Sequence, residues 1–428
     1  MRASWFFLAG LTVVQGCSDF LLNATSQVVS ARTMDFFVDL RTVVEIVPRD
    51  TLVQESIVKG CPDCADYAWR TKYGFVALNS FGYNVAADGL NEKGLSAATL
   101  FLPGSQYPTP DATDAKTRPM VTSLVTYILG NYANVEEVKA GLLHDIQVVE
   151  GDPGVQVIAD QQAAVHEDSY PLHFPVHDAA GKSIVVEFLN GTVNVYDNPA
   201  GVLTNEPPFL EQLALVAAHD KAHGTLDKTF LGGYTPVERF QRLTFLNHHT
   251  DAKFIANTTY STATPDQAAI SQAVHLISTV RIPTAYVKDG EATEYTLVRD
   301  HQNRRLFFQS NENQVLRRVD LDKIDFKNSS NRRAINVTYG DWSVDVTDVL
   351  LHSTASTIDI PSRSTIERLI HANSQPAAAI TGTVAASELH HASFWMGLGV
   401  GVGGSAIVAA FVAARVYGRK THDYVRLP

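Results

Sequence analysis

The chain has 428 residues, of which 45% are hydrophobic, and its formal net charge is −11 at pH 7. This length and composition allow one large core or two modest ones and exclude a disordered or fibrous protein. The acidic balance leaves no basic surface to neutralise phosphates, so we also exclude nucleic acids as partners.

Residues 1–16 have the pattern of a secretory signal peptide. Arg2 provides the positive charge near the start, residues 5–14 form an apolar stretch, and Val14-Gln15-Gly16 stands at the usual cleavage positions. We therefore expect the mature chain to begin at Cys17.

Helical and hairpin signals follow in the first half of the mature chain. Residues 121–129 place their apolar side chains on one helical face, and Asn134 with Glu137 forms the capping signal of a second helix. The β-rich residues 184–196 are divided by Asn190-Gly191, a strong hairpin signal. We expect two neighbouring helices and then a hairpin.

Two capping boxes with proline at the first helical position open further helices. They are Thr235-Pro236-Val237-Glu238 and Thr264-Pro265-Asp266-Gln267. Strand patterns return at residues 295–298, 306–309 and 314–319. Strands and helices that occur in groups predict an α+β layered sandwich rather than a doubly wound parallel sheet.

The C-terminal part predicts a membrane anchor. Residues 346–393 are expected to form a stalk, with one short helix near residues 366–370. Residues 394–414 carry no charge and would span about 30 Å as a helix, which matches the hydrocarbon core of a bilayer. A buried core helix and a GPI signal are the less favoured alternatives. Basic residues in the tail, residues 415–428, predict a cytoplasmic tail.

The predicted topology is a single-pass type I membrane protein with its main domain extracellular or luminal, at the plasma membrane or in endolysosomes. Five N-x-[ST] sequons would suit such a domain as glycan sites: Asn23, Asn190, Asn257, Asn328 and Asn336. Glycines at a spacing of four within the span would allow a homo-oligomer: Gly397 with Gly401, and Gly399 with Gly403.

The chain has only three cysteines. Cys61 and Cys64 lack a second pair with zinc-ligand spacing, so a local disulfide or two inert thiols are favoured over a metal or redox site. Cys17 then has no partner. An N-terminal cysteine combines a thiol with an α-amine that can take its proton, which is the arrangement of N-terminal nucleophile enzymes. Position alone leaves three alternatives open: a nucleophile, a buried structural cysteine, or a lipidated cysteine.

Five sequence blocks distinguish between these alternatives. The blocks are Cys17, Arg32-Thr33-Met34-Asp35, Asp88-Gly89-Leu90-Asn91-Glu92-Lys93-Gly94-Leu95, Gly201-Val202-Leu203-Thr204-Asn205, and Thr235-Pro236-Val237-Glu238-Arg239-Phe240. In this order they resemble the choloylglycine hydrolase family of bile-salt hydrolases and penicillin V acylases, and the resemblance runs from Cys17 to about residue 325.

The resemblance implies a catalytic role for five residues. Cys17 would be the nucleophile, and Asp35 would orient its amine. Arg32 and Arg239 would supply a positive field, and the Asn205 amide would belong to the oxyanion hole. Without the resemblance, Arg32 and Asp35 would fit an i, i+3 surface pair, and Arg239 would fit a solvated residue in the first turn of a helix.

The chain departs from the family pattern at the substrate side. Phe101 stands where the bile-salt enzymes carry asparagine and some penicillin acylases carry tyrosine, so only its backbone N–H could serve the oxyanion hole. The stretch between Asn205 and Arg239 is shorter than in the bacterial bile-salt enzymes, where it carries an assembly loop. We therefore expect Phe101 to bind the substrate's acyl group, and we do not transfer the bacterial tetramer.

The resemblance implies an αββα N-terminal nucleophile hydrolase fold over residues 17–345 and hydrolysis of a small-molecule N-acyl amide without metal or organic cofactor. The substrate would be of the penicillin V or bile-salt type. Two alternatives stay open: an amidase for N-acyl lipids or acyl-homoserine lactones, and a catalytically silent receptor or adhesion ectodomain.

Overall fold

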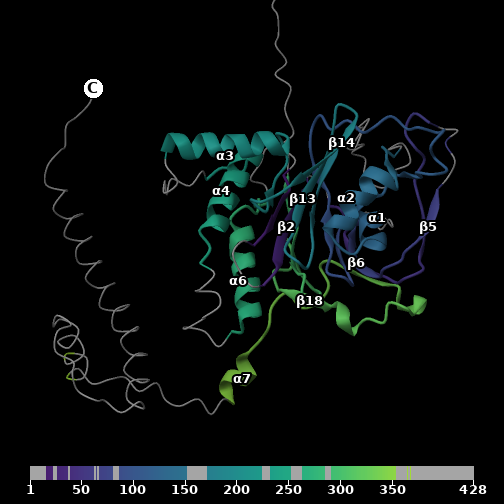
Figure 1. Ribbon diagram of the computed structural model, residues 1–428. Helices are drawn as coiled ribbons and strands as arrows, with labels where there is room; N and C mark the ends of the chain where they lie inside the picture. Colours follow the sequence, from purple (N-terminus) through teal and green to yellow (C-terminus); the bar gives the residue numbers. More distant parts are fainter. Residues whose placement is uncertain are drawn as a thin grey trace, which may run out of the picture. The chain divides into compact units, whose positions relative to one another are not determined.

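The computed structural model describes residues 16–22, 27–36, 39–61, 64, 67–80, 86–151, 171–223, 232–251, 263–284 and 291–352, together with Ser364 and Glu367. Two large β-sheets lie at the centre of the first unit of the chain, Met1–Val344, and helices lie on either side of them (Figure 1). The α+β layered sandwich expected from the sequence is therefore confirmed as a mixed, sheet-rich fold of helices and sheets.

The six-stranded sheet carries the start of the mature chain. Its order is β15 (Val202–Leu203), β1 (Ser18–Leu21), β2 (Val29–Phe36), β16 (Ala292–Asp300), β17 (Arg305–Ser310) and β18 (Arg317–Asp320). Every neighbouring pair is antiparallel. Strand β1 is thus hydrogen-bonded on both sides, which fixes the position of Cys17 immediately before it.

The nine-stranded sheet is built from the middle of the chain. Its order is β14 (Thr192–Asp197), β13 (Ser183–Leu189), β12 (Leu172–His177), β8 (Ser96–Ala98), β7 (Ala86–Asn91), β6 (Phe75–Asn79), β3 (Val43–Val47) and β19 (Arg333–Asn336), with β9 (Leu100–Phe101) paired to β12. Two small pairs complete the strands: β4 (Leu52–Gln54) with β5 (Ala68–Arg70), and β10 (Met120–Val121) with β11 (Gln147–Val148).

Different helices cover the two sheets. Helices α4 (Pro236–His248) and α6 (Pro265–Ser278) pack on the six-stranded sheet, and α3 (Phe209–His223) contacts α4. Helices α1 (Leu124–Asn131) and α2 (Val135–His144) pack on the nine-stranded sheet. Short 3₁₀ turns, η2 (Leu321–Lys323) and η3 (Ser329–Asn331), follow β18.

The capping residues predicted from the sequence have the expected contacts. The side chains of Asn134, Thr235 and Thr264 each accept a hydrogen bond from the backbone three residues later, and both capping boxes are complete. The hairpin turn is also present, with Asn190 at φ +53°. The sequence pattern did not reveal α3 or β19, and it began β18 three residues too early.

Strand alternation places polar side chains between the two sheets. In β2, Ser30, Arg32 and Met34 share one face, and Arg32 bonds to Asp88 in the nine-stranded sheet. The residues of β2 between these point to the opposite face, where the Asp35 carboxylate lies 4.0 Å from the Arg239 guanidinium of α4. Strand β2 therefore carries Arg32 on one face and Asp35 on the other.

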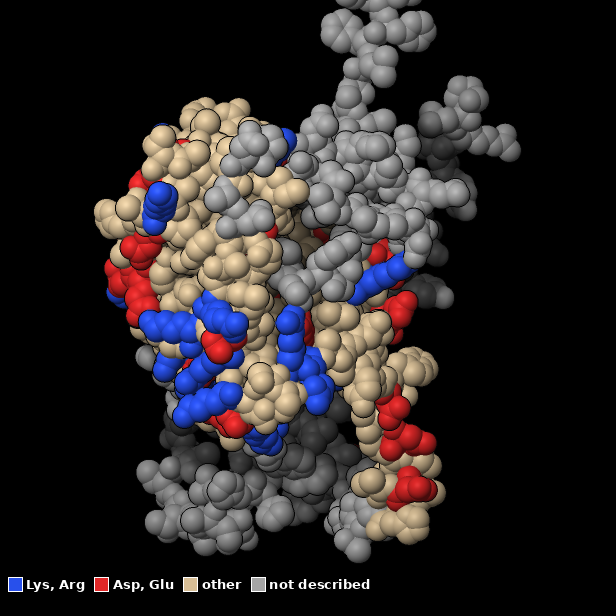
Figure 2. Space-filling view, turned by 90° about the vertical axis from the view of Figure 1, so that its right-hand side faces the viewer, with Lys and Arg blue, Asp and Glu red and all other residues tan. Residues whose placement is uncertain are grey.

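The surface carries charges of both signs, and the disulfide and the sequons can be located in the structure. On the face shown in Figure 2, Lys and Arg side chains are interspersed with Asp and Glu. Cys61 and Cys64 form a disulfide. Three of the sequons, Asn190, Asn328 and Asn336, are exposed, and the other two fall outside the described residues.

The second unit is Asp345–Pro428, in which α7 (Thr347–Leu351) is described. Residues 1–15, most of the predicted stalk and the predicted span at residues 394–414 lie outside the described residues. Within the part of the chain that the structure describes, no helix has the length and apolar character needed to cross a bilayer.

Gly94 lies in a turn of the nine-stranded sheet that is in close contact with the residue following β16 of the six-stranded sheet. Its φ is +80°, and a Cβ there would lie 2.3 Å from the carbonyl oxygen of His301. Gly94→Ala should lower the free energy of unfolding by about 2–5 kcal/mol, from left-handed strain and backbone overlap. Gly104 has φ +85° with open space around it, so Gly104→Ala should cost only about 1–2 kcal/mol. Urea unfolding measures both, and equal losses would contradict the overlap.

Candidate active site

Cys17 lies at the point where the chain enters β1. Its side chain is buried, and its Sγ lies 3.8 Å from Sδ of Met34 in the neighbouring strand β2. The Cys17 backbone N donates a hydrogen bond of 2.6 Å to Asn205 Oδ1. The thiol and the nitrogen of the same residue are therefore both held by neighbouring side chains.

Arg32 approaches the thiol from β2. Its Nη2 lies 3.7 Å from Cys17 Sγ, and its Nη1 donates to Asp88 Oδ2 at 3.1 Å and to the Tyr295 hydroxyl at 3.1 Å. The whole side chain is inaccessible to solvent. The alternative of a surface pair between Arg32 and Asp35 is therefore wrong, because the two side chains are buried on opposite faces of β2.

Asp35 occupies the other face of β2. Its Oδ2 accepts a hydrogen bond from Thr33 Oγ1 at 3.1 Å, and its Oδ1 accepts one from Thr293 Oγ1 at 2.5 Å. The carboxylate of Asp35 is thus fixed by two hydroxyl groups, and its negative charge raises the pKa of the Cys17 thiol, which burial raises most.

Arg239 comes from the first turn of α4, where the Thr235 capping box begins the helix. Its Nη1 donates to Cys17 O at 2.5 Å and to Ser18 Oγ at 2.6 Å, and its Nη2 donates to Asn205 Oδ1 at 2.9 Å. The side chain is fully buried. The alternative of a solvated first-turn arginine is therefore wrong.

Asn205 connects Cys17 to Phe101. Its Nδ2 donates to the Phe101 carbonyl at 2.9 Å, while its Oδ1 accepts from Cys17 N. Because Leu102 N bonds to Pro171 O, antiparallel alternation turns the Phe101 N–H away from β12 and toward the side of Asn205. An amide NH₂ has two donors, and the Phe101 carbonyl takes one of them.

The Phe101 side chain is half-buried. The preceding residue, Leu100, packs in the core cluster between the sheets. Since side chains alternate along a strand, the Phe101 ring points to the opposite face of β9. Its contact with Asn205 is made by the backbone, so a role for the ring in acyl binding stays a prediction.

Burial governs the electrostatics of the site. Burial raises the pKa of the Cys17 thiol, and the field of Arg32 opposes that rise. Burial also raises the pKa of Asp35 to about 6, although Arg239 and the two threonine hydroxyls act in the other direction. The thiol therefore needs a base or a positive charge close by to become a nucleophile.

Two further carboxylates beside the start of the mature chain were not identified from the sequence. Glu291 accepts a hydrogen bond from Gly16 N, and burial together with Asp35 raises the pKa of Glu291 to about 7. Burial raises the pKa of Glu206, the neighbour of Asn205. Neither carboxylate stands in a sequence pattern that could have revealed it.

Asp88 and two residues of β16 also belong to the surroundings of Arg32. Asp88 Oδ1 accepts from Arg299 Nε at 2.9 Å, and Tyr295 lies beside Arg32 in the same buried layer. Asp88 stands in one of the five sequence blocks, so its presence could have been noticed. Arg299 could not be predicted as the partner of Asp88, because 211 positions separate the two residues.

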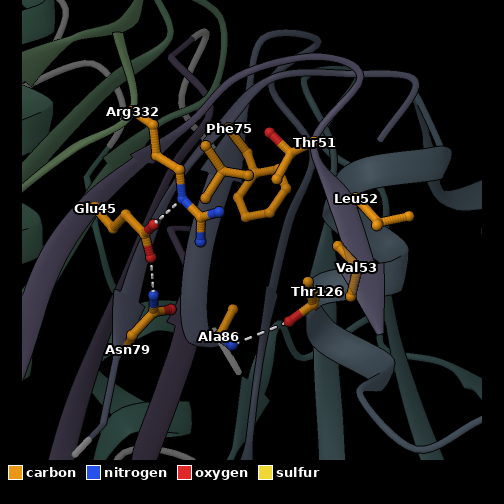
Figure 3. A pocket seen from close by; sticks show the side chains of 10 residues that line it. Glu45, Thr51, Leu52, Val53, Phe75, Asn79, Ala86, Thr126 and Arg332 are labelled. Carbon is orange, nitrogen blue, oxygen red and sulfur yellow. Dashed lines mark hydrogen bonds and ion pairs between the residues drawn. The ribbon is translucent and has the colours of Figure 1, made fainter. Parts of the chain in front are cut away.

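A separate pocket lies on the other face of the nine-stranded sheet (Figure 3). Glu45 of β3 bonds there to Asn79 of β6 and to Arg332, and Phe75 lies close to them. Phe75 belongs to the core cluster that packs against α1, whereas Cys17 belongs to the cluster between the sheets. This pocket is therefore distinct from the site around Cys17.

The structure thus places a buried cysteine between two buried arginines on a scaffold of layered sheets and helices. The sequence model of linear amide C–N hydrolases, choloylglycine hydrolase family, matches residues 17–336. The chain belongs to this family, and it is a linear amide C–N hydrolase.

Two curated relatives are similar in sequence. A penicillin V acylase of Pectobacterium atrosepticum is 27% identical over 311 residues, which cover 70% of this chain and 78% of the relative. A bile salt hydrolase/transferase of Clostridium perfringens is 29% identical over 279 residues, which cover 59% of this chain and 78% of the relative.

Solved structures share the fold. The penicillin V acylase from Agrobacterium tumefaciens is 27% identical, with a TM-score of 0.57, and the match covers 72% of this chain and 88% of that one. A mutant of the conjugated bile acid hydrolase from Clostridium perfringens is 24% identical, with a TM-score of 0.58, and the match covers 76% of this chain and 97% of that one.

Asp35 should give the hydrolysis rate an acidic limb. Because the pKa of Asp35 is about 6, kcat/KM should fall as the pH drops through this value and the carboxylate that faces Arg239 becomes neutral. Asp35→Asn should remove this limb while still bonding to Thr33 and Thr293. Glu294→Gln, on a carboxyl of β16 with a pKa of about 7, is the control and should keep it. A limb at pH 6 that survives Asp35→Asn would exclude this assignment.

Proposed function

We propose that removal of residues 1–16 exposes the α-amine of Cys17 and that Cys17 is the catalytic nucleophile. The observation that supports this most directly is the position of both reactive atoms of Cys17. Its Sγ lies 3.7 Å from a buried guanidinium, and its nitrogen lies 2.6 Å from Asn205 Oδ1, beside the Asp35 and Arg239 pair. In a processed chain, that nitrogen would be an amine within the reach of its own thiol.

The proposed first step forms a thioester. The α-amine takes the proton of the Cys17 thiol, Sγ bonds to the amide carbonyl carbon, and the carbonyl oxygen becomes an anion. The second N–H of Asn205 Nδ2 and the backbone N–H of Phe101 stabilise that anion. The C–N bond then breaks, and the protonated α-amine gives its proton to the leaving amine.

The second step is hydrolysis of the thioester. A water molecule gives one proton to the α-amine and attacks the carbonyl carbon, and the C–S bond breaks. The acid leaves, and the thiol regains its proton. Arg32 favours the thiolate at both stages, which offsets the burial that raises the thiol's pKa. The proposed chemistry uses groups of the chain alone and requires neither metal nor organic cofactor.

We propose an N-acyl amide as substrate, with an aryl-acetyl or fatty acyl group favoured over a hydroxylated steroid. One relative is named a penicillin V acylase and another a bile salt hydrolase/transferase, so the acyl groups of penicillin V and of bile salts are the two starting candidates. Phe101 offers an aromatic face without a hydrogen-bonding group, which suits an apolar acyl chain. N-acyl lipids and acyl-homoserine lactones belong to the same chemical class and are competing substrates in the test.

A catalytically silent ectodomain is the less favoured function. A silent site would not need to keep two arginines buried beside a free thiol, since burying such charges is costly.

The proposed location is a single-pass type I topology with the hydrolase domain outside the cytoplasm. Antibody staining of intact cells against the hydrolase domain tests this topology, and staining only after permeabilisation of the plasma membrane would exclude the cell surface.

Replacing the nucleophile should stop the reaction and leave the fold intact. Cys17→Ala should reduce amide hydrolysis to the background rate while changing Tm by less than about 3 °C, because the substitution removes only the Sγ atom from the buried cluster and keeps the backbone contacts of the residue. N-terminal sequencing of the mature protein should begin at Cys17. A folded Cys17→Ala protein with the original turnover, or a mature chain with residues left before Cys17, would contradict the mechanism.

Phe101 variants test the acyl preference. Phe101→Asn and Phe101→Tyr each add a polar group and keep the backbone N–H in place. We expect both to retain hydrolysis but to shift the ratio of kcat/KM between a phenoxyacetyl amide and a cholyl amide by about 10- to 200-fold. The panel should also contain a fatty acyl ethanolamide and an acyl-homoserine lactone. Unchanged ratios in both variants would show that the ring does not contact the acyl group.

A further inference from the structure

We propose that Asp88 and Tyr295 are positioning residues for the reaction, because they hold the Arg32 guanidinium against Cys17 Sγ. The proposal rests on Cys17 being the nucleophile. Neither residue contacts Sγ; both contact Nη1 of Arg32, the nitrogen beside the one that approaches the thiol. They would thus act on the nucleophile through the direction of one side chain.

Arg32 is oriented by two backbone carbonyls and by the side chains of Asp88 and Tyr295. Besides the two side chains, its Nη1 donates to Ala87 O at 3.3 Å. Its Nη2 faces Cys17 Sγ and Met34 Sδ at 3.7 and 3.5 Å and donates to Thr99 O at 2.5 Å. Sulfur atoms are weak acceptors, so they restrain a guanidinium little. Among the described residues no partner is found for Nε. The side-chain oxygen atoms that orient the rigid fork are those of Asp88 and Tyr295.

Asp88 is itself fixed from the far side. Arg299 donates from Nε to Asp88 Oδ1 at 2.9 Å, and its Nη2 bonds to Asp88 Oδ2. Arg299 Nη1 donates in turn to Asp19 Oδ2 at 3.0 Å. Each of these side chains is at most 1% exposed. A carboxylate bound by a two-pronged arginine has little freedom to turn, so it defines one position for Arg32.

Tyr295→Phe separates a positioning role of the hydroxyl from a change in the charges around the thiol and from a loss of packing. The charged groups that act on the thiol are Arg32, Asp35 and Arg239. Tyr295→Phe alters none of these charges and keeps the aromatic ring, which lies in the same core cluster as Cys17. It therefore removes only the hydroxyl that orients Arg32.

The measurement uses the full-length, processed protein with penicillin V as substrate and iodoacetamide as thiol reagent. Cys17 is the one free thiol among the three cysteines, so alkylation reports on it alone. Tyr295→Phe should lower kcat about 5- to 20-fold with KM changed less than about twofold. The midpoint of the alkylation rate against pH should rise, because a guanidinium that leaves Sγ stabilises the thiolate less.

A double-mutant cycle decides whether Tyr295 acts through Arg32. In an Arg32→Gln background, Tyr295→Phe should have no further effect on kcat or on the alkylation midpoint. If Tyr295→Phe lowers kcat by the same factor in both backgrounds, or leaves the midpoint unchanged, the positioning role is overturned. The proposed function fails by a different result, namely turnover that persists in Cys17→Ala.

Asp88→Asn extends the test with a matched control. It should lower kcat by about 50-fold or more, because it weakens both the bond to Arg32 and the bond to Arg299. Glu45→Gln also neutralises a buried, arginine-paired carboxylate, but on the other face of the nine-stranded sheet. It should lower Tm without changing kcat. A similar loss of kcat in Glu45→Gln and Asp88→Asn would show a structural effect, and Tyr295→Phe decides if Asp88→Asn does not fold.

Discussion

The buried charge of Arg32 is the constraint on which the rest of the centre depends. A guanidinium that is taken out of water must find counterions, and Arg32 finds its carboxylate partner in the facing sheet. Arg32 of β2 reaches Asp88 of β7, and Asp88 reaches back to Arg299 of β16. Arg299 then bonds to Asp19 of β1. Two arginines and two aspartates thus form a balanced ionic chain that ties the six-stranded sheet to the nine-stranded one.

The same chain explains how a nucleophile can be kept inside an apolar core. Burial disfavours thiolate, and the nearest compensating charge is the guanidinium at one end of the chain. Although burial opposes ionisation, His177 and Arg299 lower the pKa of Asp19 to about 2, so the other end stays negative. Asp19 therefore stays charged down to low pH, whereas Asp35, whose pKa is about 6, lies on the opposite face of β2.

Local structure and the set of central residues could be predicted from the sequence, whereas their arrangement could not. Capping boxes and the Asn190-Gly191 turn are local patterns, and the contacts that define them span only a few residues. The pattern of five blocks identified Cys17 and Asn205, which the fold brings into contact. It did not show that Arg32 and Asp35 lie on opposite faces, since a spacing of three fits a helix surface as well as a strand.

Partners that are distant in the chain were missed for a physical reason. Asp88 and Arg299 meet only because β7 and β16 belong to facing sheets, and no local pattern records which strands will face each other. Glu291 was missed for the same reason, since its contact with Gly16 joins positions 275 residues apart. Sequence periodicity reports burial and direction, whereas the pairing of sheets is a property of the whole fold.

The close fit around Gly16 has a practical consequence for anyone who produces this protein. A Cβ at that position would lie 2.9 Å from Ile282 Cδ1, 3.1 Å from Arg239 Nη2 and 3.3 Å from Asp35 Oδ2. A residue other than glycine joined directly to Cys17 would place a Cβ in this space, so Ile282 and the Arg239 side chain that holds the Cys17 carbonyl would have to shift by a few tenths of an ångström. The start of the domain is therefore unsuited to fusion, and affinity handles belong after the last strand, where the chain leaves the sheets.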